Sequence, residues 1–402
     1  MRHTTPSDIT EEDADEDLLR AAEQTDVKPG FPELFFDLVF VFALIQLSHG
    51  LTTHPDATGF ARAGVLFLAL WWVWVQTTLT TNLLDVRRKQ VHFLLFGLMF
   101  GGLVMSIAIP EAFEGDGLLF AVAYVAMQAA RTLFSLFALR NAEHPARMTF
   151  IRSAIWLAVS GVLWIVGATA EPEMRLWFWL AAILIEYMGP VLNYYLPGLM
   201  TAEAGASLDV SGGHFAERAA LFVIICLGET ILATGRTAAE KMDSVLTLPL
   251  LCVAFTTTVL MWWVHFHDGQ RQTARKAETT TDPQKTVEHL FIYGHFPIVA
   301  GIVLAAVGEE MSLEHPDATA NLPATLAIAG GPALFLAGSA LTKFLATRAV
   351  PLSHCAGIAA LAILALGPDM PYLMIQGATA CVLLTVAFWE YLAQRSTLPD
   401  RV

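Results

Sequence analysis

The stretch from residue 34 to residue 52 reads LFFDLVFVFALIQLSHGLT and carries a single carboxylate, Asp37, in a mostly apolar sequence. A helix needs about 20 predominantly apolar residues to cross a hydrocarbon core about 30 Å thick. This stretch has that length and that composition. It therefore predicts a transmembrane helix, and it decides the fold because the same pattern recurs along the chain.

Further apolar runs of similar length follow. We predict spans at residues 59–82, 91–109, 117–139, 151–169, 172–195, 214–235, 246–268, 289–307, 322–347, 352–366 and 371–391. The chain is 55% hydrophobic and only 15% charged, which is unlike a soluble domain. We expect an all-α, polytopic integral membrane protein with about twelve transmembrane helices, and the lipid bilayer as its first partner.

The first residues are acidic, which is the opposite of the basic start of a secretory signal peptide. They include Glu11, Glu12, Asp13, Asp15, Glu16 and Asp17. We expect a disordered acidic tail over residues 1–32. The net charge of -14 leaves no basic footprint, so we expect no nucleic-acid partner.

Lysine and arginine gather in alternate loops, and short cytoplasmic loops are the ones that retain these residues. The basic loops contain Arg87, Arg88 and Lys89, then Arg140, Arg147 and Arg152, then Arg271, Arg275, Lys276 and Lys285, and finally Arg348. The loops between them are acidic or uncharged apart from a single Arg175, and Arg236 and Lys241 in the loop after residue 235 are the one mild violation. With an even number of spans, this pattern predicts that both termini are cytoplasmic.

Several landmarks occur twice in the same order, which predicts a duplicated six-helix unit. Residues 71–72 and residues 262–263 are both Trp-Trp, and Arg131 in one unit has Lys343 as its counterpart. Residues 186–187 and residues 390–391 are both Glu-Tyr. We predict two parallel repeats, at residues 33–196 and 214–392, joined by a linker at 197–213 and followed by a tail at 393–402. Transporters commonly contain such repeats, with the site between them.

Charged residues inside a span are costly and often functional. On the predicted helix at 214–235, one face carries His214, Glu217, Arg218 and Glu229. Glu229 lies deepest, so we interpret it as a proton or cation site or as a catalytic acid. The alternative is a carboxyl group neutralised by a buried arginine or by a hydrogen bond from a neighbouring helix.

Glu33 and Asp37 share a stripe on the first helix, where acids in a first turn also complement the helix dipole. Both the functional and the structural interpretation stay open for them.

A second set of candidates is weaker. It contains His265, Asp268, His295, Arg131 and Lys343. The histidines and Asp268 would need ligands from other helices, such as Glu309, to hold a metal ion, and we favour a polar helix end over a metal site. The two basic residues can snorkel to the membrane surface or pair with Glu186, Glu390 or Glu229. We expect the tryptophans at 71, 72, 74, 262 and 263 to form membrane-interface belts.

Two motifs carry a resemblance to a known family. Residues 32–43 read PELFFDLVFVFA, and residues 214–218 read HFAER, followed by FVIICLGETIL at 222–232. They resemble the signatures of the bacterial low temperature requirement A proteins, and the likeness runs from the first predicted helix to the last. The resemblance implies a multi-pass protein of the bacterial cytoplasmic membrane. Its polar positions would be Glu33, Asp37, His214, Glu217, Arg218 and Glu229.

A weaker likeness links the first helix to the lysosomal potassium channels, whose first helix begins with Phe-Ser-Asp, whereas Phe35-Phe36-Asp37 here lacks the serine.

We therefore expect a transporter or channel for an ion or small solute that uses a buried carboxylate. The alternatives are a membrane-embedded enzyme acting on a lipophilic substrate and a membrane stress or sensor factor. The sequence names no cofactor and no substrate, and assembly into a homo-oligomer stays open.

Overall fold

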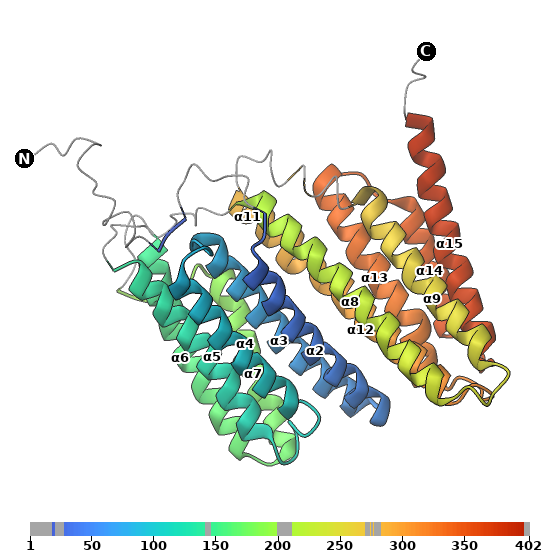
Figure 1. Ribbon diagram of the computed structural model, residues 1–402, viewed down its shortest axis with the longest axis horizontal. Helices are drawn as coiled ribbons and strands as arrows, with labels where there is room; N and C mark the ends of the chain where they lie inside the picture. Colours follow the sequence, from blue (N-terminus) through green and yellow to red (C-terminus); the bar gives the residue numbers. More distant parts are fainter. Residues whose placement is uncertain are drawn as a thin grey trace, which may run out of the picture.

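The computed structural model describes residues 18–20, 28–140, 146–198, 211–269, 274, 276 and 283–397. Long helices make up this part of the chain (Figure 1). Up to residue 240 they are α2 (Phe31–Thr53), α3 (Ala57–Leu83), α4 (Lys89–Ala108), α5 (Gly117–Ala138), α6 (Ala146–Thr169), α7 (Pro172–Val191) and α8 (Gly212–Glu240). Then follow α9 (Thr247–Val264), η1 (His265–Gly269), α11 (Pro283–Val287), η2 (Glu288–Tyr293), α12 (His295–Glu314), α13 (Leu322–Thr347), α14 (Leu352–Ala365) and α15 (Tyr372–Thr397).

Ten helical segments of the described chain are long and apolar enough to cross a membrane. They correspond to α2 to α7, α9 with η1, α12 with the turns before it, α13 and α15. The other two long helices are α14, which has 14 residues, and α8, whose apolar sequence is interrupted by Glu217, Arg218 and Glu229. Each predicted span overlaps one of these helices. The prediction of an all-helical membrane protein is confirmed.

Local chemistry explains where several helices begin. Proline occupies the first turn of α2, α7 and α13, where its missing N–H costs no hydrogen bond. The Asp56 side chain accepts a hydrogen bond from the Gly59 nitrogen at 2.7 Å and so caps α3. At the start of α2, the Glu33 carboxylate accepts the Gly30 N–H at 2.9 Å. Glu33 is therefore a helix cap as well as a site candidate.

The helices form two groups that lie side by side in Figure 1, α2 to α7 and α8 to α15. In the first group α4 packs on α2 and α5, α6 packs on α5 and α7, and α3 packs on α2 and α7. In the second group α12 packs on α8 and α13, α14 packs on α13 and α15, and α9 packs on α8 and α15. The groups meet where α2 and α3 contact α8 and α12, and we call this contact the seam.

Small residues bring α12 and α13 closest together. A Cβ atom at Gly301 would lie 2.4 Å from the Phe335 nitrogen, and one at Gly331 would lie 2.5 Å from the Ala305 nitrogen. Such stripes of glycine are typical of helix contacts in membranes, where close backbone packing drives association.

The outer surface of the bundle is apolar, as expected for a protein in contact with lipid. Phe93, Trp177 and Ile363 are all more than half exposed and belong to three different helices. Figure 1 shows that α2 begins and α15 ends at the same end of the molecule, drawn at the top.

The tryptophan prediction is wrong for one of its two clusters. Trp71, Trp72 and Trp74 are buried in the core of the bundle, whereas Trp262 and Trp263 are exposed. The first three face neighbouring helices because α3 is covered on several sides, by α2, α5, α7 and α8. Sequence alone does not show whether a helix lies at the centre or at the edge of a bundle.

The described part of the predicted tail, residues 18–20, lies against the loop after α3. The Asp85 nitrogen donates to the Leu18 carbonyl at 2.9 Å, and the Arg20 nitrogen donates to the Leu83 carbonyl at 3.0 Å. In the same loop the Arg87 guanidinium donates to Asp85 at 2.8 Å and thereby lowers the pKa of that carboxyl. This loop borders the site described next.

Candidate functional site

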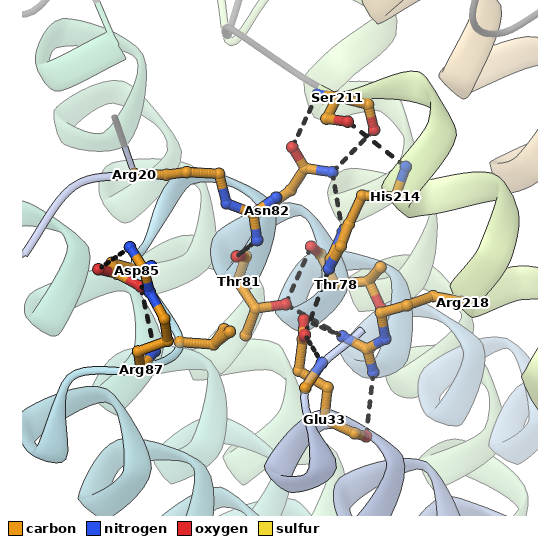
Figure 2. A network of polar contacts seen from close by, with 12 residues as sticks. Arg20, Glu33, Thr78, Thr81, Asn82, Asp85, Arg87, Ser211, His214 and Arg218 are labelled. Atoms are coloured by element: carbon orange, nitrogen blue, oxygen red, sulfur yellow. Dashed lines mark hydrogen bonds and ion pairs between the residues drawn. The ribbon is translucent and has the colours of Figure 1, made fainter. Parts of the chain in front are cut away.

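A buried network of charged side chains joins α2, α3 and α8 at the seam (Figure 2). Glu33 and Asp37 come from α2, and His214 and Arg218 come from α8. Arg218 Nη1 lies 3.3 Å from Glu33 Oε1, and its Nη2 donates to Asp37 Oδ1. His214 Nε2 lies 3.2 Å from Glu33 Oε2. Four of the six residues marked by the family motifs therefore converge.

Helix α3 supplies the remaining partners of this network. Trp74 Nε1 donates to Asp37 Oδ1 at 2.8 Å, and Thr81 Oγ1 accepts from Arg218 Nη1 at 3.0 Å. All four side chains are fully buried, so a partner for each charged or polar group among them is essential. The network holds three helices from the two groups in one fixed arrangement.

Asn82, at the end of α3, sets the orientation of the histidine. Its Oδ1 accepts the Ser211 N–H at 2.8 Å, and its Nδ2 donates to the Ser211 carbonyl at 3.0 Å. The same Nδ2 lies 3.3 Å from His214 Nδ1, which then acts as the acceptor. Because Nδ1 accepts, Nε2 carries the proton and donates it to Glu33. Sequence reasoning missed Asn82, and a polar residue at the end of an apolar helix was the signal available.

Glu229 lies apart from this network, near the other end of the seam. Together with His49 of α2 and Glu310 of α12 it lines a small hollow of about 30 Å³, which has room for about one water molecule. His49 Nδ1 lies 3.5 Å from Glu310 Oε1, and exposed Arg236 lines the hollow too. Glu229 itself is only partly buried, so the prediction that it is the deeply buried acid is wrong. The hollow is acidic when His49 is neutral, since two carboxyl groups then face one arginine.

A layer of aromatic side chains separates the hollow from the buried network. Trp71 stacks on Trp74 with ring centroids 5.0 Å apart, and Trp74 stacks on Phe222 at 4.6 Å. Phe40 of α2 lines the same narrow gap. Along α8, Arg218 and Glu229 are about 16 Å apart at 1.5 Å per residue, with Phe222 between them. The seam thus carries charged groups at two levels with an apolar layer between.

Glu217 does not join either cluster. Its side chain is partly exposed on α8 and has no hydrogen bond or ion pair with another described residue. It makes a useful control for Glu229 on the same helix.

The predicted basic residues lie in two separate clusters, one in each group. In the second group Lys343 Nζ lies 2.5 Å from Glu390 Oε2, and the predicted pairing is confirmed. Ser353 donates to the other oxygen of Glu390, and His354 Nδ1 lies 3.4 Å from it. His354 was not among the predicted residues.

In the first group the contact between base and acid is indirect. Arg131 Nη1 donates to Gln128 Oε1 at 2.5 Å, and Gln128 Nε2 donates to Glu186 Oε2 at 3.3 Å. Tyr124 donates to the same oxygen, and Trp164 Nε1 donates to Glu186 Oε1 at 3.0 Å. Glu186 therefore lies at the centre of a fully hydrogen-bonded cluster.

A cavity of about 510 Å³ adjoins this cluster between α5 and α6. Its walls are mostly aliphatic, and Tyr124, Gln128, Ser160 and Glu186 provide polar groups. A largely apolar cavity with a few convergent polar groups is the usual form of a small-molecule site.

The histidine candidates do not form a metal centre in the described chain. The rings of His265 and His295 are 5.5 Å apart, and His295 Nδ1 lies 2.9 Å from the Leu290 carbonyl. Glu309 cannot join His295 in one ion site, because 14 residues on a helix separate them by about 21 Å. Within the described ranges, no group of three or more His, Cys, Asp or Glu could hold a metal ion, and the side chain of Asp268 lies outside them.

These observations define a helical, multi-pass membrane protein whose two helix groups are joined by a buried ionic network. The sequence profile described as bacterial low temperature requirement A protein matches residues 28–388. The chain belongs to this family. It is also 50% identical over 377 residues to an uncharacterized protein of Rhizobium meliloti (strain 1021), covering 93% of this chain and 92% of that one.

Proposed function

We propose that this protein carries a cation, or a small solute bearing a positive charge, across the bacterial cytoplasmic membrane along the seam. The observation that carries the proposal is the alignment of the acidic hollow with the buried network on the same two helices, α2 and α8. A hollow lined by Glu229 and Glu310 attracts cations, because surfaces of one charge raise the local concentration of the opposite charge.

The packing order of the helices supports two parallel six-helix repeats. The contacts of α4 with α2 and α5 correspond to those of α12 with α8 and α13. The cluster of Arg131 and Glu186 corresponds to the cluster of Lys343 and Glu390. In repeats of this kind the substrate site lies between the two halves, which is the position of the seam. Cytoplasmic termini follow from the distribution of basic loops and belong to the same proposal.

In this proposal the aromatic layer is the closed gate. Trp71, Trp74 and Phe222 fill the seam between the two charged levels, so passage requires α2 and α8 to separate there. Transport then depends on a second conformation in which the layer opens, and the ionic network determines how readily it forms.

The test is flux through the purified protein in proteoliposomes, followed with a proton-sensitive dye and with Na⁺ and K⁺ gradients. We expect wild-type flux for one of these cations and a loss of at least about tenfold in Glu229→Gln, since the variant removes the charge that faces the hollow. Glu217→Gln, the same change on the same helix, should keep the wild-type rate.

Equal flux in wild type and Glu229→Gln would remove Glu229 from the pathway. The absence of flux for all three cations from wild-type protein would overturn the cation proposal.

A second candidate function is supported by the cavity between α5 and α6. Its volume and aliphatic walls suit a lipophilic substrate, and Glu186 provides an acid at its polar end. We expect a lipophilic compound to copurify with the wild-type protein and to be detected by mass spectrometry of the extracted sample. Val162→Trp, which fills the cavity from an exposed wall position, should remove it. An identical extract from both proteins would exclude this function.

A further inference from the structure

Glu309 is the most isolated acid of the described chain. Its side chain is 4% exposed, and neither of its carboxylate oxygens has a hydrogen-bond partner among the described residues. Gln376 Oε1 and Thr379 Oγ1, on residues that are 3% and 1% exposed, are unpartnered in the same sense. Buried polar groups are nearly always hydrogen-bonded, so four such oxygens in one region require an explanation.

Helix geometry places Glu309 and Thr379 at one level, about one turn inward from Gln376. Gln376 Nε2 donates to Ser312 Oγ at 2.6 Å, which joins α12 to α15 near the end of one and the start of the other. The Ala320 nitrogen donates to the Met370 carbonyl at 2.8 Å just beyond, so the two helices run in opposite directions. Glu309 lies about one turn before Ser312 on α12, and Thr379 lies about one turn after Gln376 on α15. Because the helices are antiparallel, both residues lie inward from the contact of Ser312 with Gln376.

The orientation of the Gln376 amide follows from Ser312. The Ser312 hydroxyl donates to the Glu309 carbonyl at 2.7 Å, so only its lone pairs remain for Gln376. Gln376 must therefore present its nitrogen to Ser312 and direct Oε1 away from it. The Thr385 hydroxyl, on the same helix, donates to the Cys381 carbonyl at 2.8 Å. The Thr379 oxygen, in contrast, has no hydrogen-bond partner among the described residues.

We propose that Glu309, Gln376 and Thr379 form a binding site for an alkali-metal cation between α12 and α15. The unpartnered atoms are a carboxylate, an amide oxygen and a hydroxyl, which are hard oxygen ligands of the kind that bind hard cations. The single carboxylate balances one positive charge.

The neighbouring acid does not add a second charge to this site. Glu310 follows Glu309 by 100° around the helix and faces His49 across the seam. A divalent ion would keep an uncompensated charge inside the bundle, where isolated charge is expensive. The charge at this site therefore fits Na⁺ or K⁺ better than Ca²⁺ or Mg²⁺.

Protonation of Glu309 is the competing explanation. A protonated Glu309 carboxyl and the Thr379 hydroxyl together provide two donors, which serve these oxygens only in pairs. A cation contacts all of them at once. The experiment below separates proton binding from cation binding. The site is separate from the acidic hollow, and its existence does not depend on transport along the seam.

The experiment measures thermal unfolding of the full-length protein in detergent micelles while NaCl or KCl replaces choline chloride at constant ionic strength. Constant ionic strength removes general screening as a cause. A ligand that binds only the folded state raises the unfolding midpoint as its concentration increases. We expect Na⁺ or K⁺ to raise the wild-type midpoint relative to choline, and Glu309→Gln to abolish the rise. Glu314→Gln, which removes a carboxylate five residues along the same chain, should keep it.

Thr379→Val provides the milder test if Glu309→Gln does not fold. Loss of one neutral ligand should raise the half-maximal cation concentration by about tenfold while the midpoint in choline stays close to wild type. An unfolding midpoint that is the same in Na⁺, K⁺ and choline but rises on acidification would show proton binding alone and overturn the proposal. A cation response that survives in both variants would also overturn it.

Discussion

The seam holds charged residues at two levels, and the two levels are built differently although both use α2 and α8. At the first level Glu33 and Asp37 each contact Arg218, Asn82 orients His214, and the side chains are closed off from the surroundings. At the second level Glu229 is partly exposed, and the one ion pair that the described residues form there is the 3.5 Å contact of His49 with Glu310. The first level resembles a structural joint, and the second has the openness that a binding site needs.

The family motifs reflect this difference. Residues 32–43 and 214–218 supply the joint, and residues 222–232 run from the aromatic layer to the hollow. A membrane protein that must change shape needs both a firm contact between its halves and a weakly held region beside it. Substitutions should therefore have a stability cost at the first level and a functional cost at the second.

The largest effect on stability is expected from Arg218→Leu. It leaves the Glu33 and Asp37 carboxylates buried without their main positive partner, and breaking a buried pair in this way costs about 3–5 kcal/mol. The free energy of unfolding in mixed micelles, measured by titration with sodium dodecyl sulfate, gives this value. Arg236→Leu, on the same helix but exposed, is the matched control and should change it by less than about 0.5 kcal/mol. If both variants were equally stable, the network would not join the two groups.

An intermediate effect is expected from Trp74→Phe. The change removes the indole N–H that donates to Asp37 at 2.8 Å, and a hydrogen bond to a charged group contributes about 1.5–3 kcal/mol. Trp72→Phe is a close control, because Trp72 is also buried on α3 but its Nε1 has no hydrogen-bond partner among the described residues. The same titration should give a larger loss for Trp74→Phe. Equal losses would assign the role of Trp74 to ring packing alone.

Sequence reasoning succeeded for features that one helix determines by itself. Ten of the twelve predicted spans followed from apolar length, and the stripe of Glu33 and Asp37 followed from helical periodicity. The motif resemblance found the correct family, and its marked positions included Glu33, Asp37, His214 and Arg218 of the network.

Sequence reasoning failed for features that depend on which helices are neighbours. Trp74, Thr81 and Asn82 contribute to the network from α3, and no periodicity within α3 indicates which helix they face. The burial of Trp71 and the partial exposure of Glu229 depend on the same information. Enclosure by other helices was therefore not inferred from the sequence.

The smallest effect on stability is expected from Glu229→Gln. The carboxyl group is only partly buried and has no hydrogen bond or ion pair with another described side chain, so the amide should change the free energy of unfolding by less than about 0.5 kcal/mol. The corresponding change at the first level, Glu33→Gln, weakens the contacts with His214 and Arg218 and should cost several times more. The same micelle titration compares the two variants directly. A large loss in Glu229→Gln would make the second level a structural joint like the first, and the hollow could then no longer be assigned to an exchangeable ligand.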